Sequence, residues 1–137
     1  EESCWEWEPE NGYLLTSRVL DGGGDVRALL CMNDRLAFGA YQACQERGVG
    51  VGRDISIVSF DNDELAAYLR PGLTTIQLPH EEMGREAVRL LLAGESSAQR
   101  LIDMPVVERA SIAAQDPDSA TARRAAERLA ARRAVPV

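Results

Sequence analysis

The sequence contains no lysine, one histidine and only three cysteines among its 137 residues. The cysteines, Cys4, Cys31 and Cys44, show neither a CxxC pair nor the spacing of metal ligands, which excludes the usual zinc and disulfide frameworks. No apolar run approaches the roughly 18 residues that a membrane span needs, and no signal peptide opens the sequence. We therefore expect a cytoplasmic protein that binds neither a metal nor a membrane and uses no cofactor.

The charge balance is acidic, with 22 Asp and Glu residues against 15 basic ones and a net charge of −7. An acidic surface repels phosphate backbones, so this chain is expected to bind nucleic acid poorly by itself. The length suits one ordinary domain, and the apolar share of 45% is typical of a globular protein. Because the first residue is Glu rather than Met, we expect a fragment or a processed product.

Residues 28–62 read as a strand, a helix and a second strand. The apolar run 28–32 predicts a strand that is buried on both faces. Asp34 is expected to cap the helix that follows, and Gly48 to end it. The second run, 55–60, stops at Asp61. Two parallel strands joined by a helix form a right-handed βαβ unit, and ligands of such sheets bind beyond the carboxyl ends of the strands. Asn33 and Asp61 stand at these two ends.

The remaining elements follow from turn and cap signals. Pro9 predicts the start of a helix that Gly22–Gly24 ends, and residues 63–69 a short helical turn. Residues 73–76 and 101–107 predict strands. Pro79 to Gly94 predicts a helix with one apolar face, formed by Met83, Ala87, Leu90 and Leu91. Residues 116–137, rich in Ala and Arg, predict a frayed helix or a disordered tail.

Four motifs in this order, CMNDRLAFGAY, DISIVSFDN, RPGLTTIQLPHEEMGREAVRLLL and MPVVERAS, resemble the effector-binding domain of the LacI/GalR family of transcriptional regulators over about residues 5–112. The resemblance implies an α/β fold of the type I periplasmic-binding-protein-like class, a parallel sheet flanked by helices. The chain would be a partial domain: residues 1–76 form most of the C-terminal lobe, 77–108 a helix and strand of the N-terminal lobe, and 109–115 return to the C-terminal lobe.

The resemblance also implies three ligand contacts. Asp61 stands where the family has a ligand-binding carboxylate, Asn33 where it has an amide, and Trp7 where an aromatic ring covers the ligand. Many relatives carry Gln after the TTI-x element, whereas this sequence has Leu78 there, after Gln77. Simpler interpretations stay open from the residues alone. Asp61 could only cap the turn after its strand, Asn33 and Asp34 could only stop the strand and cap the helix, and Trp7 could be a packing lid.

The family's subunit contacts imply a homodimer. The matching positions form two groups, one on the helix after Asn33 and one in the following turn: Phe38, Tyr41, Gln42 and Gln45, then Leu65, Tyr68 and Leu69. Phe38 and Tyr41 could equally be ordinary core residues.

The leading hypothesis is therefore a sugar-sensing fragment of a DNA-binding regulator, in which a small-molecule effector closes two lobes. Operator DNA would bind only through an N-terminal helix-turn-helix headpiece that this sequence lacks. The alternative is a periplasmic sugar-binding protein of a transporter, which shares the fold. An enzyme that uses Asp61 as a base is not expected, because no GxSxG, Walker loop or His–acid pair accompanies it.

Overall fold

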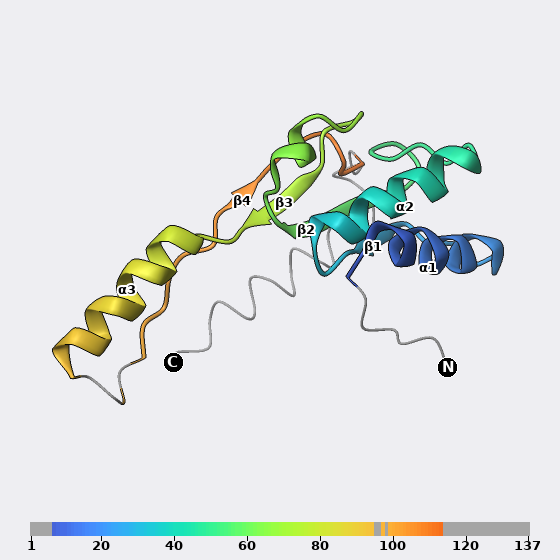
Figure 1. Ribbon diagram of the computed structural model, residues 1–137. Helices are drawn as coiled ribbons and strands as arrows, with labels where there is room; N and C mark the ends of the chain where they lie inside the picture. The colour runs from blue at the N-terminus through green and yellow to red at the C-terminus, as the bar shows by residue number, and fades with distance from the viewer. Residues whose placement is uncertain (1–6, 95–96, 98, 114–137) are drawn as a thin grey trace, which may run out of the picture.

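The computed structural model describes residues 7–94, 97 and 99–113, so Cys4 and the Ala/Arg-rich segment 116–137 lie outside the described residues. The elements alternate along the chain as the apolar runs predict (Figure 1). They are α1 (Pro9–Asp21), β1 (Ala28–Leu30), α2 (Asp34–Glu46), β2 (Ser56–Asp61), the 3-10 turn η1 (Glu64–Ala67), β3 (Thr74–Gln77), α3 (His80–Ala93) and β4 (Val106–Val107).

The described strands form one sheet in the order β1-β2-β3-β4. β1 pairs with β2 and β2 with β3 in parallel, which confirms the predicted βαβ unit. β4 is antiparallel to β3, because the chain has turned back after α3 before it rejoins the sheet. The three parallel strands direct their carboxyl ends toward one edge, and this edge carries the candidate site.

The helix α2 packs against both α1 and β2 and supplies half of the buried core residues. Two glycines, Gly12 of α1 and Gly39 of α2, lie where the helices cross. A Cβ at Gly39 would meet backbone atoms of Pro9 and Tyr13, and one at Gly12 would meet the backbone of Leu36. The core itself consists of Ala37, Ala40, Tyr41, Cys44, Ile55, Ile57, Ala66 and Leu73.

The prediction that residues 28–32 are buried on both faces is wrong. Leu29 packs against the core, but Leu30 is 65% exposed and Met32 is 57% exposed. Side chains alternate across a strand, and α2 packs against only one face of the sheet. Leu30 therefore points away from α2 and toward solvent.

The strand predicted over residues 101–107 is also too long, since only Val106 and Val107 pair with β3. Pro105 has no N–H to donate to a ladder, although its carbonyl accepts from Gln77 N at 2.9 Å. The segment before Pro105 returns from the far end of α3, beyond the reach of β3 (Figure 1). It therefore has no strand to pair with among the described residues.

The predicted helix after Pro79 is present as α3, and Gly94 ends it in the left-handed conformation at φ 70°. α3 projects away from the sheet and from the pair α1 and α2 (Figure 1). None of its residues is buried. In the described part of the chain, no helix has the length and hydropathy that a membrane crossing would require.

Candidate functional site at the carboxyl edge of the sheet

The ends of β1 and β2 open into one pocket of about 380 Å³. The three residues for which a ligand contact is expected, Trp7, Asn33 and Asp61, all line it, so the fold brings them together. Met32, Phe60 and Leu78 complete the lining. Met32 and Phe60 were not predicted as site residues, although each directly precedes a predicted one at the end of its strand.

Asn33 caps α2, which confirms one of its two interpretations, whereas the prediction that Asp34 is the cap is wrong. Its Oδ1 accepts from the backbone N–H of Leu36 at 2.8 Å, and its backbone is extended, as an N-cap requires. Its Nδ2 donates to the carbonyl oxygen of Trp7 at 3.2 Å, which ties the segment before α1 to the start of α2. The side chain of Trp7 remains 47% exposed. An amide has two N–H groups and two acceptor lone pairs, so Asn33 keeps one of each for a ligand.

Asp61 occupies a backbone conformation that side chains rarely adopt. Its φ is 115°, and φ of the next residue, Asn62, is 58°. Such conformations cost on the order of 1–3 kcal/mol each and persist where the surroundings impose them. The cap of the following turn η1 is Asp63, whose Oδ1 accepts from Leu65 N at 2.8 Å. Asp63, and not Asp61, therefore caps this turn.

The carboxyl group of Asp61 has a raised pKa. The largest cause is burial, which disfavours the charged form, and the next is the negative charge of Asp34. The backbone N–H of Asp34 acts in the opposite direction. A carboxylate that is half-buried beside a second carboxylate gains from any ligand that brings hydroxyl or N–H donors to it.

Asp34 is fully buried and binds groups from three elements instead of capping its helix. Its Oδ1 accepts from the hydroxyls of Ser59 on β2 and of Thr75 on β3, the latter at 2.7 Å. Its Oδ2 accepts from the backbone N–H of Asp63 at 2.7 Å. A buried carboxylate is tolerated only when its oxygens are satisfied in this way. Asp34 therefore fixes the start of α2 to β2, to β3 and to the turn after β2.

A second set of hydrogen bonds reaches the same turn from the segment after β4. Nη2 of Arg109 donates to Oδ1 of Asn62 at 2.8 Å, and its Nη1 donates to the carbonyl of Leu73 at 2.7 Å. Further along, the hydroxyl of Ser111 donates to the carbonyl of Ile57 at 2.6 Å and accepts from Thr74 N at 2.8 Å. These bonds fasten the returning chain across the strands.

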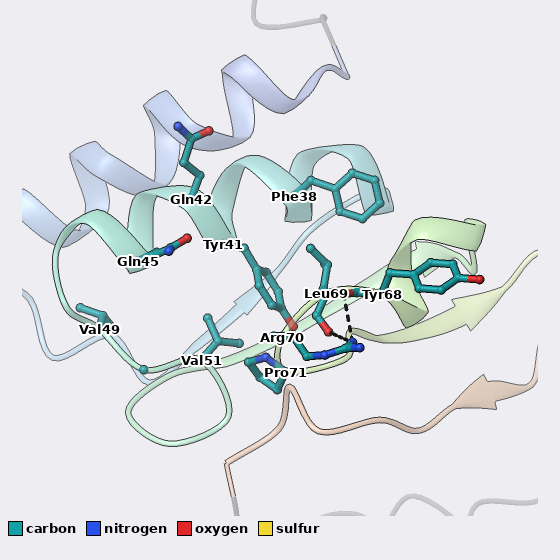
Figure 2. A pocket seen from close by; sticks show the side chains of 11 residues that line it. Phe38, Tyr41, Gln42, Gln45, Val49, Val51, Tyr68, Leu69, Arg70 and Pro71 are labelled. Atoms are coloured by element: carbon teal, nitrogen blue, oxygen red, sulfur yellow. Dashed lines mark hydrogen bonds between the residues drawn. The ribbon is translucent and has the colours of Figure 1, made fainter.

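A larger groove of about 550 Å³ lies on the opposite side of α2 from α1 (Figure 2). All the predicted subunit-contact residues except Leu65 line it: Phe38, Tyr41, Gln42, Gln45, Tyr68 and Leu69. Leu65 lies outside the lining and is 57% exposed. Figure 2 shows Tyr41 pointing from α2 toward the loop that carries Leu69 and Arg70.

The alternative that Phe38 and Tyr41 belong to the core also holds, because Tyr41 is 8% exposed and Phe38 packs against the buried cluster. Burial raises the pKa of the Tyr41 hydroxyl to about 12. The two residues thus form the floor of the groove, and Tyr68, which is 65% exposed, forms part of its rim.

Burial raises the pKa of both described thiols, Cys31 and Cys44, which disfavours the reactive thiolate. Burial raises the pKa of Cys31 to about 11, so almost none of it is thiolate near neutral pH. Among residues 7–94, 97 and 99–113, no group of three or more His, Cys, Asp or Glu side chains could hold a metal ion. The pocket instead presents the carboxylate of Asp61, the amide of Asn33 and the aromatic ring of Trp7. These groups are suited to binding a polar organic molecule.

The chain is similar to known proteins in both sequence and fold. Residues 6–112 match the family described as periplasmic binding protein-like domain. The ribose operon repressor of Haemophilus influenzae is 42% identical over 83 residues, which are 61% of this chain and 25% of that protein. The chain thus spans about a quarter of this curated relative.

Two solved structures are similar in fold. The lac repressor dimer bound to operator and the anti-inducer ONPF superposes with a TM-score of 0.73 at 32% identity, covering 80% of this chain and 40% of the repressor chain. A LacI family transcriptional regulator from Enterococcus faecium with bound ribose superposes with a TM-score of 0.65 at 29% identity, covering 81% and 42%. Together with the family match, these similarities show that the chain belongs to the periplasmic binding protein-like family, as part of a sensor domain of the LacI/GalR type.

Proposed function

We propose that this chain is the effector-sensing part of a LacI/GalR-type transcriptional regulator, and that its effector is a sugar or a related polyhydroxy compound. The observation that carries the proposal is the pocket shared by Asn33, Asp61 and Trp7 at the strand ends. Relatives named as repressors favour this role over that of a transporter's binding protein or an enzyme. We further propose that the regulator acts in the cytoplasm.

The three residues offer complementary chemistry to a sugar. The two oxygens of Asp61 can accept from adjacent hydroxyls in bidentate fashion. The remaining N–H of Asn33 can donate to a ring or hydroxyl oxygen, and its free lone pair can accept. The exposed ring of Trp7 can pack on the apolar C–H face of the sugar, which is a frequent role of aromatic side chains in such pockets.

The rest of the lining favours a ligand with one apolar side. Met32, Phe60 and Leu78 contribute no strong hydrogen-bonding side chain. A hydroxyl that faced Leu78 would lose its water without gaining a partner, which is costly. We therefore propose that the effector lacks a hydroxyl at this position, which would separate it from sugars that fit the Gln of other family members.

Signal transmission requires the rest of the regulator. In this proposal residues 1–76 and 109–115 belong to the C-terminal lobe, and residues 77–108 cross into the N-terminal lobe. An effector that binds one arrangement of the lobes more tightly shifts the population toward it and changes the affinity of a headpiece for operator DNA. The headpiece would have to come from outside this chain.

The test is a titration of the complete regulator with D-ribose and a panel of other sugars and purines, followed by operator binding. We expect one compound to change the operator affinity. Asp61→Asn should weaken binding of that compound about 10- to 100-fold, because hydrogen bonds to charged groups contribute about 1.5–3 kcal/mol. Isothermal titration calorimetry measures the loss directly.

The matched control is Asp25→Asn, which removes a carboxylate that is 81% exposed and pairs with Arg27 away from the pocket. It should leave the affinity unchanged. If no compound of the panel altered operator binding, the sensing role would be wrong. Equal affinities of the Asp61→Asn variant and its parent would remove Asp61 from the ligand site.

We also propose that the groove beside α2 pairs two copies of the regulator, as the dimeric structure of the lac repressor suggests. Tyr68→Glu should raise the dissociation constant of the dimer by at least about 100-fold, because an unpaired charge buried at an interface costs about 3–5 kcal/mol. Tyr68 is 65% exposed in the single chain, so folding should be unaffected. Analytical ultracentrifugation gives the constant.

Leu15→Glu is the control for this variant. Leu15 is 52% exposed on α1, outside the groove, and its replacement should leave the dimer intact. A Tyr68→Glu variant that stays dimeric at the parent's concentrations would refute the proposed interface.

A further inference from the structure

The turn after β2 has positive φ angles, and its backbone N–H groups donate to buried side chains. Both Asp61 and Asn62 have positive φ; the value of 58° at Asn62 lies in the left-handed region that Asn tolerates, whereas 115° at Asp61 lies outside it. The direction of the Asp61 carboxylate depends on this conformation, because a change of its φ would rotate the side chain away from Asn33. Whatever holds the two residues there also determines where the carboxylate points.

The two backbone N–H groups that follow Asp61 are both bound by one buried network. Asn62 N donates to Oγ1 of Thr75 at 3.2 Å, and that hydroxyl donates in turn to Oδ1 of Asp34 at 2.7 Å. Asp63 N donates to Oδ2 of Asp34 at 2.7 Å. Asp34 and Thr75 are both fully buried, so water cannot replace either of them. The side chains of this network therefore bind the turn immediately after Asp61, and Asp34 also acts on the Asp61 carboxyl directly, through its charge and its backbone N–H.

We propose that Asp34 and Thr75 are positioning residues for the ligand-binding carboxylate of Asp61. They impose the left-handed turn, and the turn aims the carboxylate into the pocket that it shares with Asn33 and Trp7. Neither residue lines the pocket, and their side chains act through the backbone of Asn62 and Asp63. Because the charge of Asp34 also acts on Asp61 directly, Thr75→Val is the variant that isolates the support of the turn. The proposal rests on the proposed function, because it needs Asp61 to be a ligand contact.

A variant of Ser59 distinguishes this positioning role from a general effect on stability. Its hydroxyl binds the same Oδ1 of Asp34 and is equally buried, but Ser59 makes no hydrogen bond to the turn. Ser59→Ala and Thr75→Val each remove one buried hydroxyl from Asp34. Only Thr75→Val also removes the acceptor of Asn62 N. The two variants therefore lose the same kind of buried hydrogen bond, but only Thr75→Val also weakens the hydrogen bonding of the turn.

The experiment compares Thr75→Val, Thr75→Ser, Asp34→Asn and Ser59→Ala in the complete regulator, with Asp61→Asn as the reference and D-ribose as the probe. Thr75→Ser keeps the hydroxyl and should restore parent behaviour. In Asp34→Asn, the amide oxygen can still accept from the hydroxyls of Ser59 and Thr75. The amide NH₂ then faces the backbone N–H of Asp63, and because both groups are donors, no hydrogen bond can form there. Urea unfolding of each variant verifies that all are folded under the assay conditions.

Two quantities are measured: the backbone chemical shifts and amide exchange of residues 61–63 by NMR, and the dissociation constant for D-ribose. We expect Thr75→Val and Asp34→Asn to lose the left-handed signature and the protection of the Asn62 and Asp63 amides. Their affinity should fall about 10-fold, the equivalent of one hydrogen bond. Thr75→Ser and Ser59→Ala should keep both the turn and the affinity.

The other outcomes overturn the proposal in distinguishable ways. If the turn is unchanged in Thr75→Val and Asp34→Asn, the network does not impose it, whatever the ligand does. If the turn is lost but affinity falls only in Asp61→Asn, Asp61 binds the sugar without this support. If Asp61→Asn binds D-ribose as the parent does, the proposed ligand site itself is wrong and the positioning role is lost with it.

Discussion

Gly39→Ala is expected to destabilise the protein by about 3 kcal/mol or more. The added Cβ would lie 2.5 Å from the backbone nitrogen of Tyr13 and still closer to the carbonyl oxygen of Pro9. Both are backbone atoms of α1, so no side chain can rotate away, and the methyl group fits only if α1 and α2 separate. That separation would open the core above the sheet. A thermal or urea unfolding curve measures the loss.

Gly84→Ala provides the control, since it is the same substitution inside a helix. A Cβ at Gly84, in α3, meets nothing within 4 Å. Alanine is favoured over glycine in helix interiors by about 1 kcal/mol, so this variant should be as stable as the parent or slightly more stable. An unfolding curve for Gly39→Ala that coincided with that of the parent would show that the two helices do not touch at this point.

The isolated chain is expected to be marginally stable or to associate through α3. Leu91 and Leu92 are 80% and 85% exposed, and Met83 and Val88 are about half exposed. Full burial of each such side chain contributes roughly 1.5–3 kcal/mol, and the chain alone does not gain this. We therefore expect a thermal midpoint below about 60 °C, within or below the range of mesophilic domains. Calorimetry at several concentrations measures the midpoint and its dependence on association.

The double variant Leu91→Glu with Leu92→Glu tests the role of this face. Both side chains are already in solvent, so the midpoint of a monomer should not fall, whereas association should decrease. A sharp transition above about 60 °C from a monomeric parent chain would contradict the expectation. It would mean that α3 gains its stability without a partner for its apolar side.

The order of the elements could be predicted from local signals, because each lies within a few residues. Pro9 and Gly22 bound α1, and the apolar runs give the parallel strands. The polar ends of those strands could be predicted for the same reason, since parallel strands direct their carboxyl ends to one edge. The meeting of Asn33 and Asp61 therefore followed from topology alone.

The cap of α2 could not be predicted from the neighbouring residues alone. Asn33 and Asp34 are both good caps, and nothing adjacent to them distinguishes the two. The choice depends on hydroxyls that arrive from residues 59 and 75, on other strands. A signal was nevertheless present, because Ser59 and Thr75 are polar residues within buried strands, and such residues require a partner. The close contact of Gly12 and Gly39 left no comparable signal, because it depends on how two helices cross.

The hydrogen bond from Asn33 to the carbonyl oxygen of Trp7 has a consequence for the energetics of the proposed site. One amide both starts α2 and anchors the segment that bears the indole ring, so removing it would disturb the polar contact and the aromatic lid together. The contributions of the two residues to affinity are then not separable, and a double-mutant cycle on them would report a coupling free energy rather than two independent terms. The dependence runs in one direction, because Asn33 binds the backbone carbonyl of Trp7 and a replacement of the indole side chain would leave that bond in place.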